Sequence, residues 1–443
     1  MKTYDLLIIG SGSSGCVATK TAAKEGYDIC LIDCKPKEGI GDKVCGDAIS
    51  KHHFDTLGID YPKGEESEHN IKGIEVYSPD LNSVLRMEDQ SLSGFIINRR
   101  LFGQRLLKKA LDTGVTFYDN TVAIEPILLE GFVKGVKVRN IKNGRIEKIQ
   151  AKIVMDASGI SAVLRRNLPS DFGMENHIDR QDLMSCHREI RDNIDFDSNY
   201  CKIYLNLKIA PAGYYWIFPK GNGKVNVGLG VQAKENSPSP KAQLYRYVLS
   251  NEIFRKSSTI DSGGGFVPTR RPMDSLVSNG VMLLGDAACL VNPIHGGGIG
   301  PSMLSGKLAT EVAIDALSNS LPSIKNLWEY NRKYMKEYGA KQASLDIFRI
   351  FLQSINDDDL NYGMEHQILK PKDVLEANLK GELKLGINEK IERAFRGIRK
   401  IGLLVKLRNT AKKMRRIKDL YKKYPEIEKF DEWKIEVLKI RSP

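Results

Sequence analysis

The first 33 residues constrain the fold more than any other part of the chain. An apolar run, Tyr4–Ile9, leads directly into the glycine-rich stretch Gly10–Gly15, and a stretch rich in Ala, Thr and Lys follows. A second apolar run, 27–32, then ends in Asp33. This order predicts a strand, a tight turn, a helix and a second strand, which is the dinucleotide-binding arrangement. We therefore expect an α/β fold whose core is a Rossmann-like unit.

Each glycine of the G-x-G-x-x-G pattern has a separate physical role. Gly10 permits the tight turn, Gly12 lets a pyrophosphate approach the backbone, and Gly15 allows the helix to pack closely on the strand. The free N–H groups of the helix N-terminus then face the phosphates. Asp33 is placed to accept hydrogen bonds from ribose hydroxyls. A chance glycine-rich loop would leave Asp33 unexplained.

A second glycine-rich region identifies the dinucleotide. The strand predicted from Gly280 ends in Gly285-Asp286, and the turn Pro293–Gly300 leads into a helix predicted over 301–317. This arrangement resembles the Gly-Asp motif of FAD enzymes related to p-hydroxybenzoate hydroxylase. The resemblance implies that Asp286 binds the ribityl chain and that the turn lies under the flavin pyrimidine. A helix N-terminus aimed at that edge would stabilise the anionic reduced flavin.

Two further stretches resemble the same family. Asp156-Ala-Ser158-Gly159 follows a predicted strand and resembles the family's DxxG-type turn, and Asn98–Phe102 opens a predicted helix whose Arg99 would reach the phosphates of FAD. The resemblance implies a set of FAD-binding residues. These are Gly10, Gly12, Ser14, Gly15, Asp33, Cys34, Cys45, Gly46, Ala48, Arg99, Ala123, Asp156, Gly159, Gly285, Asp286, Pro293, Gly297, Gly298 and Ile299.

An aromatic strand indicates the substrate. In the stretch 211–219, which reads P-x-x-Y-x-W-x-F-P, the period of two places Tyr214, Trp216 and Phe218 on one face. Taken alone, such a face is more often the core of a hairpin, here turned at 220–223. The spacing resembles the motif of geranylgeranyl reductases, which also carry a Cys-Gly pair beside the flavin, as Cys45 and its neighbour do here.

This family resemblance implies an activity, which is FAD-dependent saturation of the geranylgeranyl chains of archaeal ether phospholipids. Hydride would pass from N5 of reduced flavin to each double bond, together with a proton. Tyr214, Trp216, Phe218 and His295 would border the substrate, with His295 more structural than catalytic. Cys45 is the catalytic candidate, although a thiol with an ordinary pKa of about 8.5 is a weak acid. If Cys45 does not donate the proton, it would hold the flavin and the alkene in the correct relative position, or it would be a small buried residue without a catalytic role.

Two rival functions remain open at this stage. One is a FAD monooxygenase on the same fold, and the other is a non-catalytic prenyl-lipid carrier, which would have a degraded flavin site. The sequence contains no second strand–GxGxxG–helix unit. We therefore expect the electrons to come from NAD(P)H visiting the FAD or from a carrier such as ferredoxin.

The predicted architecture is α+β overall, with three units. They are a Rossmann-like FAD-binding domain (1–62, 90–170 and 275–320), an inserted antiparallel-sheet substrate domain (63–89 and 171–274) and a helical C-terminal domain (321–443). Seven cysteines without a CxxC pair predict neither a disulfide scaffold nor a metal site.

The positive charge is concentrated near the C-terminus. The whole chain has a formal net charge of +12, and the segment 390–423 holds 14 Lys or Arg against two acidic residues. Apolar residues recur there at helical spacing, at Leu404, Leu407, Ala411, Met414, Ile417 and Tyr421. Such a helix lies on an anionic membrane surface or packs its apolar face on its own domain. No nucleic-acid motif accompanies the charge.

The apolar stretches are too short for a signal peptide or for a membrane span. We therefore expect a cytoplasmic protein that associates peripherally with the inner face of the cell membrane.

Overall fold

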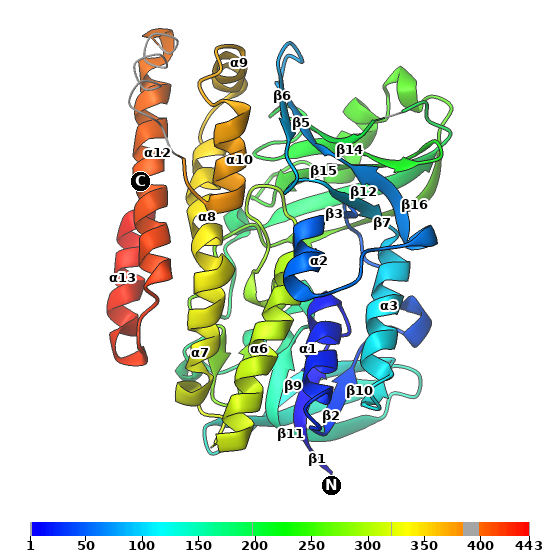
Figure 1. The fold of residues 1–443 in the computed structure, drawn as a ribbon, viewed down its shortest axis with the longest axis vertical. Helices are drawn as coiled ribbons and strands as arrows, with labels where there is room; N and C mark the ends of the chain where they lie inside the picture. Colours follow the sequence, from blue (N-terminus) through cyan, green and yellow to red (C-terminus); the bar gives the residue numbers. More distant parts are fainter. Residues whose placement is uncertain (1, 197, 320, 384–397, 443) are drawn as a thin grey trace.

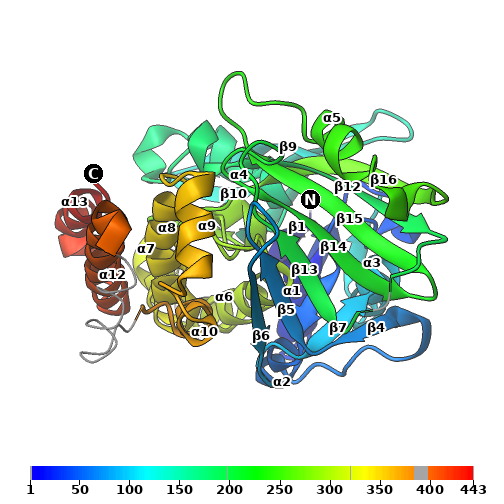
Figure 2. The same cartoon turned by 90° about the horizontal axis from the view of Figure 1, so that it is seen from above.

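The structure is a computed structural model that describes residues 2–196, 198–319, 321–383 and 398–442. The chain forms two large sheets and a layer of long helices beside them (Figures 1 and 2). The expected fold class is confirmed, because a mixed sheet with parallel central strands, a largely antiparallel sheet and a helical C-terminal region are all present.

The first sheet carries the predicted Rossmann-like unit. Its strands are β1 (Thr3–Ile9), β2 (Ile29–Ile32), β8 (Thr116–Tyr118), β9 (Thr121–Leu129), β10 (Phe132–Asn140), β11 (Ile146–Asp156), β17 (Val277–Ser278) and β18 (Val281–Leu283). The order is β17-β18-β11-β1-β2-β8, and β10 joins β9 to β11. β1 lies parallel to both β2 and β11 and is buried from Leu6 to Ile9, as expected for a parallel strand covered on both faces.

Three helices pack beside this sheet. They are α1 (Ser13–Ala23), α3 (Arg99–Leu111) and α6 (Ile299–Asn319). α1 and α6 approach closely, since a Cβ on Gly306 would lie 2.3 Å from the carbonyl oxygen of Ser14. Figure 1 shows the three helices side by side in the lower half of the molecule. Their N-terminal ends therefore meet at the carboxyl edge of the parallel strands.

The second sheet contains the aromatic strand. Its strands are β5 (Gly73–Tyr77), β6 (Val84–Glu88), β12 (Met184–Asp192), β13 (Tyr200–Tyr204), β14 (Tyr214–Gly221), β15 (Lys224–Gln232) and β16 (Ser258–Val267). The order is β16-β12-β15-β14-β13-β5-β6. All neighbouring pairs are antiparallel except β13 with β5. β13 ends at Tyr204 because the backbone turns at Asn206, whose Oδ1 accepts a hydrogen bond from Ile209 N.

A small third sheet lies between the two large ones. It consists of β3 (Ala48–Ser50), β7 (Gly94–Ile97) and β4 (Ser67–Ile71). The short helix α2 (Lys51–Leu57) directly follows β3. Because β4, from the predicted substrate domain, pairs with β7, from the predicted FAD-binding domain, this sheet joins the two units. The exact domain boundaries stay a prediction. Two other short helices, α4 (Val163–Asn167) and α5 (Pro240–Gln243), lie outside the sheets.

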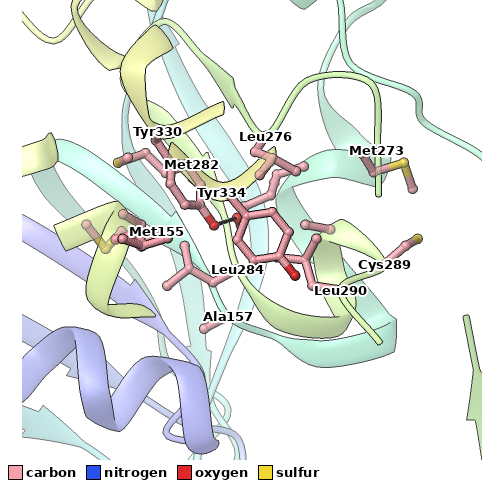
Figure 3. Packing of buried hydrophobic residues seen from close by; sticks show 14 of the residues in the cluster. Met155, Ala157, Met273, Leu276, Met282, Leu284, Cys289, Leu290, Tyr330 and Tyr334 are labelled. Atoms are coloured by element: carbon pink, nitrogen blue, oxygen red, sulfur yellow. Dashed lines mark hydrogen bonds between the residues drawn. The ribbon is translucent and has the colours of Figure 1, made fainter. Parts of the chain in front are cut away.

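The C-terminal helices form a layer on one side. They are α7 (Ile324–Tyr334), α8 (Ala340–Leu352), α9 (Asp357–Glu365), α10 (Pro371–Lys380), α12 (Ile401–Lys422) and α13 (Phe430–Arg441). Figure 3 shows how the core continues from the first sheet into α7, where Tyr330 and Tyr334 pack beside Met282 and Leu284. Tyr330 also donates a hydrogen bond of 3.0 Å from its hydroxyl to the Leu283 carbonyl.

The basic segment forms α12, which lies with α13 at the edge of this layer in Figures 1 and 2, apart from positions 390–397, which lie outside the described residues. Its predicted apolar face packs inward. Leu407, Met414, Ile417 and Tyr421 are buried, and Leu404 and Ala411 are half-buried. Within the described residues, no helix is long and apolar enough to cross a bilayer.

Candidate cofactor and substrate site

A continuous cavity of about 880 Å³ runs through the molecule. One end is lined by the Gly-rich turn after β1 and by the segment 41–46. Its middle is lined by the aromatic residues of β14 and by the turn before α6. Its far end is lined by apolar side chains of α8, α9, α10 and α12, including Leu403 and Leu407. The cavity therefore joins a nucleotide-type turn to a long apolar space.

The Gly-rich turn has the packing expected of a dinucleotide site. Gly10 has a φ of +99°, and a Cβ on Gly15 would lie 1.8 Å from the carbonyl oxygen of Gly10. Gly15 is therefore required by the close approach of α1 to the end of β1, and Gly10 by its positive φ and by the Ala157 carbonyl oxygen, 2.5 Å from where its Cβ would lie. A Cβ on Gly12 would meet nothing within 4 Å. The space in front of the α1 N-terminus is open at that residue.

Asp33 directly follows β2 and lines this space. Its Oδ2 accepts hydrogen bonds of 2.7 Å from both the backbone N–H and the hydroxyl of Ser11, and its Oδ1 accepts from Lys35 N at 2.9 Å. Three donors thus fix the carboxylate at the carboxyl end of the strand. An oriented carboxylate at this position is the usual partner of ribose hydroxyls.

Arg99 reaches the turn from the start of α3. Asn98 caps this helix by accepting from Leu101 N at 3.2 Å, and Arg99 Nη2 donates to Ser13 Oγ at 2.9 Å. Its Nε and Nη1 atoms are buried and have no hydrogen-bond partner among the described residues. Unused buried guanidinium donors beside a helix N-terminus suit a phosphate, so the residues here fit the pyrophosphate of FAD.

Asp286 follows β18 and carries a salt bridge. Lys43 Nζ lies 2.8 Å from Asp286 Oδ2. A Cβ on Gly298 would lie 3.4 Å from Asp286 Oδ1, so the carboxylate sits directly beside the turn that precedes α6. The ion pair also connects that turn to the segment 41–46 across the cavity.

His295 holds the shape of the same turn. Its Nδ1 accepts a hydrogen bond of 3.1 Å from Gly297 N, and its carbonyl oxygen accepts one of 2.9 Å from the Tyr214 hydroxyl. Burial lowers the pKa of His295 to about 4, so the ring is neutral at physiological pH. His295 therefore links the turn to the aromatic strand as a structural residue that also lines the cavity.

The three aromatic side chains of β14 line the cavity together. Ring centroids are 6.0 Å apart for Tyr214 and Trp216, and 6.2 Å apart for Trp216 and Phe218. The Trp216 ring covers Gly228 of β15, where a Cβ would lie 2.2 Å from the indole. A Cβ on Gly46 would lie 3.1 Å from the Phe218 ring. Two glycines thus provide the space in which the rings stand.

A buried polar network supports this wall, and sequence reasoning missed it. Asn226 Nδ2 donates to the Cys45 carbonyl at 2.8 Å and to Asp47 Oδ2 at 2.9 Å, and Lys220 Nζ donates to Asp47 Oδ2 at 2.8 Å. Lys220 also pairs with Glu68. Burial alone would lower the pKa of Lys220, but the two carboxylates raise it above its ordinary value. The only sequence signal is that Asp47 directly follows the Cys-Gly pair.

Cys45 stands at the edge of this network. Its Sγ accepts a hydrogen bond of 3.3 Å from Asp47 N and lines the cavity. Burial, and then the Asp47 carboxylate, raise the pKa of the Cys45 thiol. The thiol therefore keeps its proton at neutral pH.

Most predicted site residues line this cavity. These are Gly10, Gly12, Ser14, Asp33, Cys34, Cys45, Gly46, Arg99, Ala123, Gly159, Tyr214, Trp216, Phe218, Asp286, Pro293, His295, Gly298 and Ile299.

The predicted residues Gly15, Ala48, Asp156, Gly285 and Gly297 lie behind that lining. Asp156 is fully buried, and its carboxylate accepts from Ser158 N at 3.1 Å and from Leu164 N at 2.8 Å. Asp156 therefore shapes the turn at Gly159 instead of facing the cavity.

Comparison with known proteins agrees with this geometry. Residues 182–267 match the model of the geranylgeranyl reductase catalytic domain. A digeranylgeranylglycerophospholipid reductase of Sulfolobus acidocaldarius is 42% identical over 95% of this chain and 93% of its own. One from Methanothrix thermoacetophila is 32% identical over 86% of this chain and 95% of its own.

Among solved structures, a geranylgeranyl bacteriochlorophyll reductase-like protein of Thermoplasma acidophilum has a TM-score of 0.76 and 27% identity, covering 93% of this chain and all of that one. The FAD-dependent halogenase CndH has a TM-score of 0.65 at 16% identity over 90% of this chain and 97% of that one, a likeness of fold alone. On the strength of the full-length relatives, this chain belongs to the family of digeranylgeranylglycerophospholipid reductases.

Proposed function

We propose that this protein is a FAD-dependent reductase that saturates the geranylgeranyl chains of archaeal ether phospholipids. The observation that carries the proposal is the single cavity that joins the Arg99 and Gly-rich turn to the aromatic wall and to the apolar space beyond it. The names of the full-length relatives support the same activity.

The residues of this chain divide the binding of FAD among them. Asp33 would bind the ribose of the adenosine half, and Arg99 with the open space at Gly12 would bind the pyrophosphate. Asp286 would bind the ribityl chain after its salt bridge with Lys43 breaks. The turn 293–299 would lie at the pyrimidine edge of the flavin. The bound cofactor supplies, in its reduced form, the hydride that an unpolarised alkene requires.

The substrate side of the cavity positions the alkene and excludes water. Trp216 and its two aromatic neighbours form one wall, and their rings are held by hydrogen bonds and glycine contacts rather than by the substrate itself. Cys45 carries a proton on Sγ at the junction of the two regions. It is the candidate proton donor, or the residue that keeps the alkene in register, and its raised pKa makes it a weak acid.

Electrons would reach the site from NAD(P)H or from a carrier such as ferredoxin. The sequence holds one strand–GxGxxG–helix unit, which the proposed FAD site uses. A visiting donor therefore fits this chain better than a resident nicotinamide domain.

Peripheral attachment to the inner face of the cell membrane, from the cytoplasm, would bring the enzyme to its lipid. The outer face of α12 supports this proposal through its exposed cations. These are Lys406, Arg408, Lys412, Arg415, Arg416, Lys422 and Lys423. Since the apolar face packs inward, charge would dominate the attachment, helped by the exposed Ile401 and Val405 at the start of the helix.

The decisive experiment is anaerobic incubation of dithionite-reduced protein with a geranylgeranyl phospholipid, followed by mass spectrometry. We expect a gain of two hydrogens for each double bond reduced. Oxygen consumption with hydroxylated product would instead identify a monooxygenase. A colourless purified protein that binds the lipid unchanged would identify a carrier.

A further inference from the structure

A second cavity, of about 540 Å³, lies beside α8 and α13 and has a different chemistry from the first. Its lining carries five basic side chains and three acidic ones. The basic residues are Lys234, Arg270, Arg271, Arg349 and Arg441, and the acidic ones are Glu175, Asp179 and Asp182. We refer to it as the arginine cavity. Behind the lining, Asp346 pairs with Arg349 and Arg441, and Asp274 pairs with Arg271, so the charges of the cluster are closely balanced. Arg270, Arg271 and Arg349 are buried.

Carboxylates position these arginines without using all of their donors. Arg270 pairs with Glu175 at 2.9 Å, and Arg349 Nη2 lies 2.7 Å from both Asp182 Oδ1 and Asp346 Oδ1. The Nε atoms of Arg270 and Arg441 are nevertheless buried with no hydrogen-bond partner in the part of the chain described. An unpartnered buried donor costs free energy, so the network retains capacity for further acceptor oxygens.

The arginine cavity adjoins the first cavity. Arg349 and Gln353 line both. Gln353 Oε1 accepts from Arg349 Nη1 at 2.9 Å, and its Nε2 donates to the Ala212 carbonyl at 3.1 Å, so a polar pair separates the arginine-lined space from the apolar one. At the rim, Leu438 of α13 is 58% exposed. This sequence of environments matches an amphiphile that has an anionic head and an apolar chain.

We propose that the arginine cavity binds the phosphate-bearing head of the lipid substrate while the isoprenoid chain passes Arg349 and Gln353 into the apolar cavity. The inference rests on the proposed function and adds the site that recognises the head. Guanidinium groups bind phosphate oxygens in pairs, which makes arginine better suited to this role than lysine. The arginine cavity would then set the preference for phospholipid over a neutral prenyl alcohol.

The test compares two substrates, a geranylgeranyl glycerophospholipid and geranylgeraniol, both dispersed in detergent. Arg441→Gln should raise KM for the phospholipid about ten-fold or more, with little change in kcat and with the KM for geranylgeraniol unaltered. Arg332→Gln, which removes an exposed arginine paired with Glu426, is the matched control and should alter neither KM. Equal changes for both substrates, or no change for either, would overturn the proposal.

Two further measurements test the proposal even if Arg441→Gln folds poorly. Lys234→Gln removes an exposed rim cation, and it should raise the phospholipid KM two- to three-fold without lowering Tm. On the parent protein, glycerol phosphate should compete with the phospholipid but not with geranylgeraniol. Inhibition of both substrates by inorganic phosphate would assign a free-phosphate site instead and overturn the head-group role.

Binding can also be followed without turnover, which separates this proposal from the proposed function. Glycerol phosphate should raise the Tm of the FAD-loaded parent and not that of Arg441→Gln. A parent that reduces neither substrate but shows this difference would refute the activity alone. A parent that reduces both substrates without the difference would refute the arginine cavity alone.

Discussion

The indole Nε1 of Trp216 donates a 2.9 Å hydrogen bond to Oδ1 of Asn226 in the protein interior. The amide nitrogen of the same Asn226 donates to the Cys45 carbonyl and to Asp47. One side chain therefore fixes the aromatic wall relative to the Cys-Gly segment, although Asn226 and Cys45 lie 181 residues apart in the sequence. The geometry between substrate wall and cofactor segment depends on this amide.

Asn226→Ala should remove the hydrogen bonds that connect the aromatic wall to the Cys-Gly segment. The variant leaves the Trp216 N–H and the Asp47 carboxylate short of partners, and we expect a loss of about 1–3 kcal/mol in the free energy of unfolding, with lower lipid turnover. Denaturant unfolding and turnover per bound FAD measure the two effects. Asn167→Ala, at an exposed helix end, is the control. Turnover equal to that of the parent would show that the network serves stability only.

Trp216→Ala should weaken lipid reduction while FAD stays bound. Removing a packed aromatic ring costs about 3–5 kcal/mol in stability, and here it also opens the cavity wall. Trp433→Ala is matched to it, because Trp433 is buried between α12 and α13 away from the cavity lining. Steady-state kinetics with a geranylgeranyl lipid should separate the two. If both variants lose turnover alike, the wall has no special role in binding substrate.

Asp33→Ala and Asp286→Ala should each lower FAD occupancy. A hydrogen bond to a charged acceptor contributes about 1.5–3 kcal/mol, and both carboxylates lie in the cavity. Flavin absorbance per protein after gel filtration gives the occupancy. Asp112→Ala removes an exposed carboxylate paired with Lys108 and should leave occupancy unchanged. Full flavin content in both cavity variants would contradict the assignment.

Cys45→Ala should slow single-turnover reduction without abolishing FAD binding. Because burial raises the pKa of this thiol above its ordinary value of about 8.5, the parent should keep a flat rate from neutral pH up to at least that value. If the thiol donates the proton, the rate falls only at higher pH, where the proton is lost. Stopped-flow measurements with Cys201→Ala, a buried cysteine outside the cavity lining, provide the comparison. Identical rates in all three proteins would remove Cys45 from the mechanism.

Changing Lys412, Lys413, Arg415 and Arg416 to Gln should reduce co-sedimentation with anionic vesicles. Each cation near an anionic surface contributes about 1 kcal/mol, and salt should weaken binding because charges are screened within about 10 Å at 0.1 M. Turnover of detergent-dispersed lipid should persist.

A second quadruple variant makes the vesicle result specific. Changing Lys24, Lys108, Lys142 and Lys148 to Gln removes the same net charge from exposed sites outside α12. This protein should sediment like the parent. Equal loss of sedimentation in both variants would show that total charge, and not the α12 surface, governs attachment.

Local patterns in the sequence were sufficient to predict those elements whose structure depends on neighbouring residues. The turn from Gly10 to Gly15, the start of α3 and the aromatic strand each follow from short-range spacing, and the structure contains all three. The amphipathic pattern of α12 was also readable, but its apolar side packs on the protein because α8 offers a partner that the local sequence does not reveal.

Long-range partners were not readable in the same way. Lys220 and Asp47 are 173 residues apart in the sequence, and each looks like an ordinary polar residue of a turn. Asp156 has a motif position but turns its carboxylate to local N–H groups. The arginine cavity gathers side chains from five separate stretches of the chain. Such sites exist only after the sheets and helices have docked.

The position of α12 has a thermodynamic consequence. Leu403 and Leu407 on its inner face line the apolar cavity, while its outer face carries exposed cations. A lipid chain that packs against the inner face stabilises the docked position of α12. By thermodynamic linkage, any effect of lipid binding in the cavity on membrane binding at the outer face is matched by an equal effect of membrane binding on lipid binding. Lipid binding in the cavity and binding to the bilayer would then be coupled. The substrate-bound enzyme and the enzyme that has released its product would therefore stay at the membrane for different lengths of time.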